Sequence, residues 1–139
     1  MSSDLRFPRV LHVLIHLSLR ERMMSSTEIA EMLSTNPVVV RRLLAGLRES
    51  GLMEVTKGRS GGWRVAKPLD QISMRAVFDA LGQPGMSEAH ETRDHPGCPV
   101  EAAVNQTLTK VEAEAAVLTL KLYEGMTLEQ IASMATSSD

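Results

Sequence analysis

The fold of this chain is decided by residues 25–51, which read SSTEIAEMLSTNPVVVRRLLAGLRESG. Ser25 and Glu28 have the spacing of a capping box, in which two side chains satisfy the first free amides of a helix. Pro37 suits the first position of a second helix, because that position needs no amide donor. Gly51 is of the residue type that commonly follows a helix end. The stretch therefore predicts two helices joined by a tight turn, which is a helix-turn-helix.

The sequence on either side supplies a first helix and a hairpin. Apolar residues recur at helical spacing between Leu5 and Leu17, which predicts an amphipathic helix of about four turns. After the helix-turn-helix come two short β-compatible runs, at 52–56 and 63–65, and the loop KGRSGG between them holds three glycines. Such a loop is typical of turns with positive φ, so we expect a β-hairpin, the wing of a winged helix-turn-helix. The side chains predicted to face the core from the helix-turn-helix are Ile29, Ala30, Leu33, Val40, Leu43, Leu44 and Leu47.

The second half of the chain is predicted to be helical around one long loop. After a short fourth helix, residues 83–99 carry three prolines, two glycines and no periodicity, which indicates a mobile loop. Pro99 starts the longest helix, which runs to about Glu124. A capping box at 127–130 opens a last short helix that runs through Met134.

The long helix carries apolar residues at alternating steps of four and three positions, which is a heptad seam. The chain has too few other elements to cover this seam. The seam therefore predicts a surface that a second copy of the chain covers, in a homodimer. The fold class is mainly α with a small β-hairpin wing: a winged helix-turn-helix domain at 1–68, then a linker helix, mobile loop and dimerisation helix at 69–139. The predicted dimerisation residues are Val104, Leu108, Val111, Ala115, Leu118 and Leu122.

The charge of the chain is divided unevenly. The formal net charge is −2, yet residues 1–68 carry eleven Lys and Arg against six Asp and Glu, and residues 69–139 carry four against eleven. The basic excess coincides with the helix-turn-helix and the wing. It therefore favours binding of a polyanion, double-stranded DNA, by this half of the chain.

The candidate DNA-binding residues follow from how such motifs dock. The second helix of the motif enters the major groove, where Arg pairs with guanine and Val touches thymine methyl groups. Basic wing residues reach phosphates or the adjacent minor groove, and hydroxyls at a helix N-terminus bind phosphate. The predicted residues are Ser26, Thr27, Asn36, Val38, Val39, Arg41, Arg42, Lys57, Arg59, Ser60 and Arg64.

Other classes of function are disfavoured. Cys98, the only cysteine, cannot form an internal disulfide, and the apolar stretch at 10–19 is too short and polar to cross a bilayer, so we expect a cytoplasmic protein with no membrane partner. No nucleophile elbow or phosphate-binding glycine loop is present, so an enzyme is not expected. His12 is predicted to be a hydrogen-bonded core histidine, and no Glu or Cys completes a metal site with His16 one turn away. We therefore expect no metal and no cofactor.

Two runs resemble a known signature. LRESGL at 47–52 and KGRSGGW at 57–63 resemble the L-R-x-x-G-L and R-G-x-x-G-G-[YFW] patterns of the Rrf2 family of transcriptional regulators. The resemblance implies a homodimer joined through the long helix that binds an imperfect palindrome, usually as a repressor. Lys57 stands where the family has Arg, which keeps the charge and loses the bidentate fork. The family's DNA contacts carry over to the region of Val38, Arg41, Arg42 and Arg59.

Signal sensing is the part of the resemblance that this sequence does not match. Members that bind an iron–sulfur cluster have three cysteines before the long helix, and one thiolate, Cys98, cannot supply that ligand set. Only unusual ligands such as His12, His90 or His95 would complete it. Cys98 precedes Pro99, and a thiol at a helix N-terminus with a histidine nearby oxidises or conjugates readily. Cys98 and His95 are therefore a candidate sensor of redox state or of a small molecule. The alternative is an unreactive, half-buried thiol.

Two further interpretations stay open. A winged helix can bind a protein instead of DNA, in which case apolar anchors rather than arginines dominate the interface. The chain can also bind DNA with no sensing function of its own. The effector is unknown from sequence.

Overall fold

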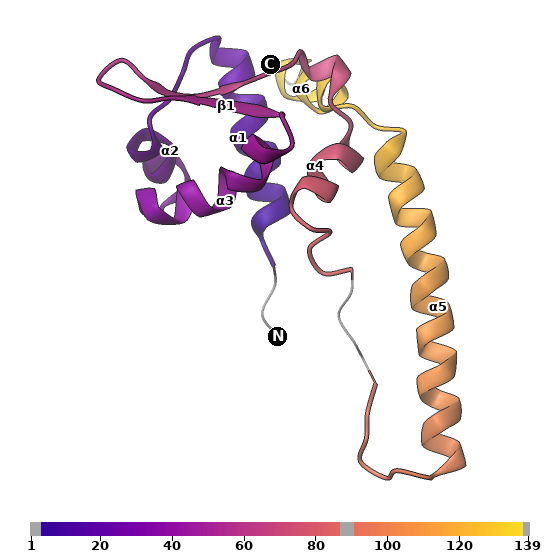
Figure 1. Ribbon diagram of the computed structural model, residues 1–139. Helices are drawn as coiled ribbons and strands as arrows, with labels where there is room; N and C mark the ends of the chain where they lie inside the picture. Colours follow the sequence, from indigo (N-terminus) through magenta and orange to yellow (C-terminus); the bar gives the residue numbers. More distant parts are fainter. Residues whose placement is uncertain (1–3, 87–90, 138–139) are drawn as a thin grey trace.

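The computed structural model describes residues 4–86 and 91–137 (Figure 1). Helices α1–α3 and a β-hairpin lie together and are named here the winged unit, while α5 projects away from it and α6 returns to it. The helices are α1 (Arg6–Arg20), α2 (Ser26–Leu33), α3 (Pro37–Glu49), α4 (Met74–Ala80), α5 (Pro99–Glu124) and α6 (Leu128–Ser137), with a 3-10 turn η1 (Leu69–Gln71). The strands are β1 (Met53–Thr56) and β2 (Gly62–Val65).

The capping box predicted before α2 is confirmed. The Glu28 amide donates to Ser25 Oγ at 3.1 Å, and the Ser25 amide donates to Glu28 Oε1 at 3.2 Å. The pKa of the Glu28 carboxyl is held below its usual range by the Ser25 amide and, second, by the Arg22 guanidinium. Local sequence therefore fixes where α2 begins.

The bounds of α3 are also set by its own sequence. Asn36 caps the helix, since its Oδ1 accepts from the Val39 amide at 3.1 Å, and Pro37 is the first helical residue. The helix ends at Glu49, and Gly51 follows in the left-handed region with φ 80°. The helix-turn-helix predicted from residues 25–51 is thus present.

The hairpin explains the glycines of the wing. The strands pair antiparallel, with Val55 opposite Trp63. The first strand begins one residue later than predicted, and the second begins one residue earlier. The backbone of Trp63 exchanges hydrogen bonds with that of Met24, at 2.8 and 3.2 Å, so the hairpin is tied to the segment before α2. A Cβ on Gly62 would lie 2.6 Å from the Met24 carbonyl oxygen, so only glycine allows this close approach.

The core is built as the apolar pattern predicts. All the core residues predicted from the helix-turn-helix are buried except Leu33, which is half-buried. The same cluster continues through Ile72 and Val77 to Leu128 of α6. Because the core is continuous across residue 68, the division of the chain at that point stays a prediction.

The long helix α5 is attached mainly at its C-terminal end. It spans Pro99–Glu124 as predicted, and none of its residues is buried. The ring of Tyr123 lies 5.2 Å from that of Phe7 in α1 and 5.1 Å from that of Phe78 in α4, and the two Phe rings are 5.0 Å apart. These three side chains, named here the aromatic cluster, join α5 to the winged unit.

Helix α6 departs from the sequence prediction in two details. It extends to Ser137 rather than Met134, because Ala, Thr and Ser follow with no helix breaker. Half of the predicted capping box forms: the Thr127 amide donates to Gln130 Oε1 at 2.9 Å, whereas the Gln130 amide donates to the Thr127 carbonyl.

Candidate nucleic-acid interface

The outer side of α3 is a ridge of exposed side chains. Val38 is 50% exposed, Arg41 and Arg42 are exposed, and Ala45 follows half-buried one turn later. Spacings of three and four residues place these positions along one side of the helix, opposite the buried Val40 row. The ridge therefore presents two guanidinium groups beside small apolar groups, which suits the base edges of a major groove.

A hollow of about 460 Å³ separates this ridge from the hairpin, and we name it the wing-side hollow. It brings together three predicted residues, Ser26, Arg41 and Lys57. Ser26 Oγ accepts a hydrogen bond from Trp63 Nε1 at 3.0 Å, which leaves its hydroxyl hydrogen to donate. The hollow is lined by Ser26, Arg41, Ala45, Arg48, Glu49, Val55, Lys57 and Trp63.

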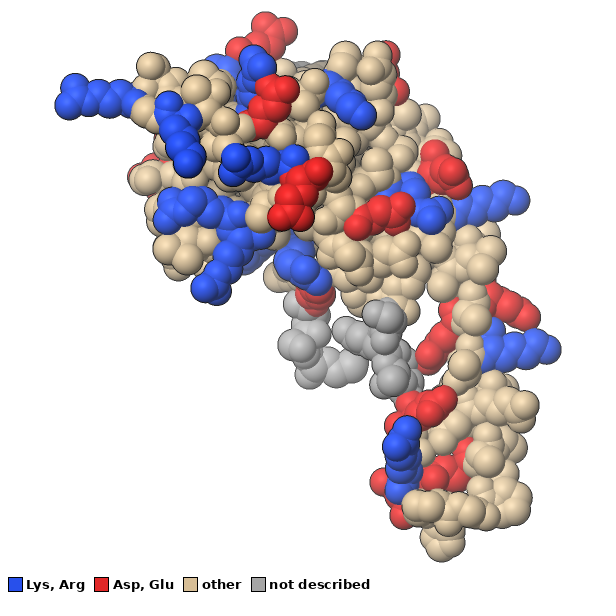
Figure 2. All heavy atoms as spheres, in the orientation of Figure 1, with Lys and Arg blue, Asp and Glu red and all other residues tan. Residues whose placement is uncertain are grey.

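The tip of the hairpin carries the remaining wing residues. Lys57, Arg59 and Ser60 are all exposed. Lys and Arg side chains gather over the hairpin and the helices beside it, whereas Asp and Glu are prominent along α5 (Figure 2). The uneven charge predicted from the two halves of the sequence is therefore present on the folded surface.

Ion pairing separates the basic residues into two groups. Arg22 pairs with Glu28 at 3.1 Å, and Arg64 pairs with Glu54 across the two strands. Within residues 4–86 and 91–137, no ion pair is formed by Arg41, Arg42, Lys57 or Arg59. These four cations of the ridge and the wing are therefore not engaged by a carboxylate of the described residues and are available to a phosphate backbone.

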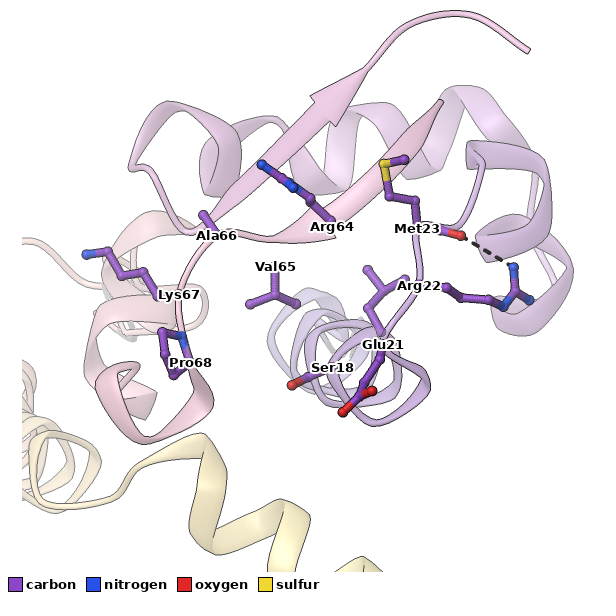
Figure 3. Close-up of a pocket in the computed structure, with 10 residues that line it drawn as sticks. Ser18, Glu21, Arg22, Met23, Arg64, Val65, Ala66, Lys67 and Pro68 are labelled. Carbon is purple, nitrogen blue, oxygen red and sulfur yellow. Dashed lines mark hydrogen bonds between the residues drawn. The ribbon is translucent and has the colours of Figure 1, made fainter. Parts of the chain in front are cut away.

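Arg64 lies apart from the other predicted residues. Its strand position, opposite Glu54, faces away from the wing-side hollow that Val55 and Trp63 line. Arg64 instead lines a hollow of about 640 Å³ between the end of α1 and the segment after β2 (Figure 3). The structure thus does not bring Arg64 together with Arg41 and Lys57.

The three other candidates lie near the starts of the two helices. Thr27 is exposed in the first turn of α2. The side-chain oxygen of Asn36 is engaged in capping α3, although the residue is exposed. Val39 is half-buried and faces α1 rather than the wing.

The predicted dimerisation residues form an uncovered apolar row on α5. Leu108 is 43% exposed and Leu118 58%, and the other four are exposed as well. Val100, which is 71% exposed, continues the row by one turn toward the N-terminus. Val100 is not among the residues predicted from the sequence, although its position four residues before Val104 fits the seam.

Cys98 is the N-cap residue of α5, as predicted, and is half-buried with no hydrogen bond from its sulfur to the helix amides. The preceding segment is bonded to the first turns of the helix: Glu101 Oε2 accepts from the His95 amide at 3.1 Å and from Thr92 Oγ1 at 3.2 Å. Asn105 pairs with both backbone groups of Thr92, at 2.9 and 3.1 Å. These bonds hold Cys98 and His95 close to α5.

The prediction for His12 is wrong. His12 is exposed, not in the core, because the buried face of α1 is centred on Val13, Leu14 and Leu17. His16 is half-buried, with its ring 5.7 Å from that of His12. Burial lowers the pKa of His16, and positive charge on Arg20 and His12 adds to the effect.

Comparison with known proteins gives a match over nearly the whole chain. Residues 4–134 match the family model Rrf2, described as an iron-dependent transcriptional regulator. The chain belongs to the Rrf2 family. YwnA of Bacillus subtilis (strain 168), assigned as an HTH-type transcriptional regulator, is 31% identical over 103 residues, which are 74% of this chain and 76% of YwnA. This Rrf2 protein is therefore a DNA-binding transcriptional regulator, not an enzyme.

Solved structures share the fold. A protein from Lactobacillus plantarum assigned as a transcriptional regulator has a TM-score of 0.79 at 24% identity, over 96% of this chain and 91% of its own. CymR, the global cysteine regulator of B. subtilis, has a TM-score of 0.65 at 20% identity, over 96% and 98%. The mainly helical fold with a hairpin wing is thus that of Rrf2 regulators.

The iron in the description of the family does not fit the residues of this Rrf2 chain. Iron–sulfur clusters need several thiolate or histidine ligands, and Cys98 is the only cysteine. The described residues contain no group of three or more His, Cys, Asp and Glu side chains that could hold a metal, and His90 lies outside them. No helix in the same part of the chain has the length and apolarity to span a membrane.

Proposed function

We propose that this regulator acts as a homodimeric repressor that places α3 of each copy in a major groove of an imperfect palindrome. The observation that carries the proposal is the unpaired basic surface of the α3 ridge and the wing-side hollow. Val38 and Arg41 suit base contacts, while Lys57, Arg59 and Ser60 suit the backbone or the neighbouring minor groove. Repression follows because a bound dimer blocks access of other proteins to the promoter.

The uncovered row on α5 supports the homodimer. A row of apolar residues from Val100 to Leu122, exposed along one side of a helix, is stabilised when a second copy covers it. A symmetric pair formed in this way carries two identical winged units, which is what a palindromic site requires.

Fluorescence anisotropy with a duplex selected from a random pool tests the proposal, with a scrambled duplex beside it. We expect wild-type protein to prefer the selected duplex and to bind more weakly as salt rises. Arg41→Ala should weaken binding to the selected duplex by about 1–3 kcal/mol. Lys121→Ala, a charge change on α5 outside the winged unit, is the matched control and should have little effect. Binding of neither duplex by wild type would favour a protein-interaction module instead.

We further propose that oxidation of Cys98 changes DNA binding. The thiol is partly accessible at the start of α5, in a segment held by Glu101 and Asn105, so a bulkier oxidised sulfur would disturb those bonds. Peroxide treatment should shift the affinity of wild type and leave Cys98→Ser unchanged. Equal shifts in both proteins would favour a regulator without a sensing function of its own.

A further inference from the structure

A second hollow lies on the other side of α3, between that helix and the start of α1. It has a volume of about 530 Å³, and we name it the α1-side hollow. Neighbouring arginines of α3 divide between the two hollows: Arg41 lines the wing-side one and Arg42 the α1-side one. The α1-side hollow is lined by Asp4, Leu5, Arg6, Arg9, Val39, Arg42 and Leu43.

The α1-side hollow has a positive net charge, because three arginines and one acid line it, and that acid is already bound by one of the arginines. Arg6 holds the Asp4 carboxylate through its side chain at 2.8 and 3.1 Å, and its amide donates to the same group at 3.1 Å. Arg9 is half-buried, and Arg9 and Arg42 form no ion pair with any described residue. Two guanidinium groups are thus left for an external anion.

Three of the residues that line the hollow are apolar, which restricts the kind of anion. Leu5, Val39 and Leu43 line it together with the two arginines, and Leu43 is buried. A DNA backbone presents an anionic phosphate next to a less polar sugar, so it matches a lining of both basic and apolar residues. Arginine is also well suited to phosphate, because its planar fork donates two parallel hydrogen bonds.

The position of the two hollows matches the geometry of DNA. A helix in the major groove, which is about 12 Å wide, lies between two sugar-phosphate backbones, one on each side. We propose that Arg9, together with Arg42, binds a backbone phosphate of the strand on the α1 side, opposite the strand that meets the wing-side hollow. This inference rests on the proposed function and adds α1 to the DNA-binding surface.

The salt dependence of binding tests the inference. Arg9→Gln should weaken binding to selected and scrambled duplexes by a similar factor, and should reduce the slope of log affinity against log salt by about one per winged unit. Arg9→Lys keeps the charge and should restore most of the slope. Arg20→Gln, at the other end of α1, is the matched control and should bind like wild type. An unchanged slope for Arg9→Gln in a protein that still prefers the selected duplex would overturn the inference alone.

Phosphate ethylation of the selected duplex gives a second readout. With wild type, modified phosphates that block binding should occur on both strands bordering each half-site. Arg9→Gln should lose the interference on one strand only, and circular dichroism should match wild type. Interference that is the same for both proteins would contradict the inference, whereas failure of wild type to bind any duplex would overturn the proposed function itself.

Discussion

Helices α3 and α5 each carry a row of apolar side chains along one side, yet the rows have opposite surroundings. In α3, Val40, Leu44 and Leu47 are completely buried within the chain. In α5 no residue is buried, and Leu118 is 58% exposed. An apolar row thus predicts a packing surface on a helix, but not whether the same chain covers that surface. The number of neighbouring elements in the chain decides this.

The largest effect is expected in the covered row. Leu44→Ala removes a completely buried side chain and leaves a cavity, so the free energy of unfolding should fall by about 2–5 kcal/mol. Val38→Ala, on the exposed side of the same helix, should change it by less than about 0.5 kcal/mol. Urea denaturation measures both. Similar losses for the two variants would mean that α3 does not bury the Leu44 side of the helix.

The uncovered row should affect assembly rather than folding. Leu108→Glu combined with Leu118→Glu places charges within the proposed dimer interface, so the protein should sediment as a monomer with the circular dichroism of folded protein. Its affinity for a palindromic duplex should fall by about tenfold or more, because the two winged units are no longer linked.

Ala113→Glu is the control for assembly, because it puts the same charge on the opposite side of α5. This variant should remain dimeric in the ultracentrifuge. A wild-type monomer at micromolar concentration would contradict the interpretation of the seam.

The aromatic cluster is where the two regions meet. Tyr123→Ala removes ring contacts to Phe7 and Phe78 and should lower the free energy of unfolding by about 1–3 kcal/mol. Tyr123→Phe keeps the rings, and no hydrogen bond is formed by the phenol within the described residues, so it should behave like wild type. Denaturation by urea distinguishes the variants, and equal stability of Tyr123→Ala and wild type would show that α5 is held by other contacts.

The smallest effect concerns His16. Because burial lowers its pKa below the usual value of 6.5, the unfolded chain takes up this proton at a higher pH than the folded chain. The part of the free energy of unfolding that depends on neutral His16 is fully present above pH 6.5. It is lost as the pH falls from 6.5 toward the lower pKa of the folded protein. His16→Gln should remove that part of the loss between about pH 7.5 and about pH 5.5, measured by urea denaturation. An identical loss in wild type and variant would contradict this.

The parts of the structure that the sequence predicts well are those fixed within a few residues. Ser25 with Glu28, Asn36 with Pro37, and Cys98 with Pro99 each define a helix start locally, and the structure places the starts there. The capping hydrogen bonds of Ser25 and Asn36 span only three residues, and Pro99 marks the start of α5 without one, so all three starts can be recognised without knowing the rest of the fold.

The parts that could not be predicted depend on residues distant in sequence. Arg64 is paired by Glu54 from the other strand, and Arg9 meets Arg42 only because α1 and α3 pack together. The sequence pattern predicts His12 in the core because it lies next to buried positions, yet one step of about 100° around the helix places it on the exposed face. The candidate site could thus be predicted as a region, but not which arginines remain unpaired.

Helix α5 is attached mainly at its C-terminal end, so a small rotation about that end moves its N-terminal end by a large distance. Its 26 residues measure about 39 Å at 1.5 Å per residue. The aromatic cluster lies at the attached end, and Cys98 lies at the other end. A rotation of about 5° about the aromatic cluster would displace the N-terminal end of so long a helix by about 3 Å. In a dimer joined along α5, a small change in structure near Cys98 would therefore change the distance between the α3 helices of the two copies.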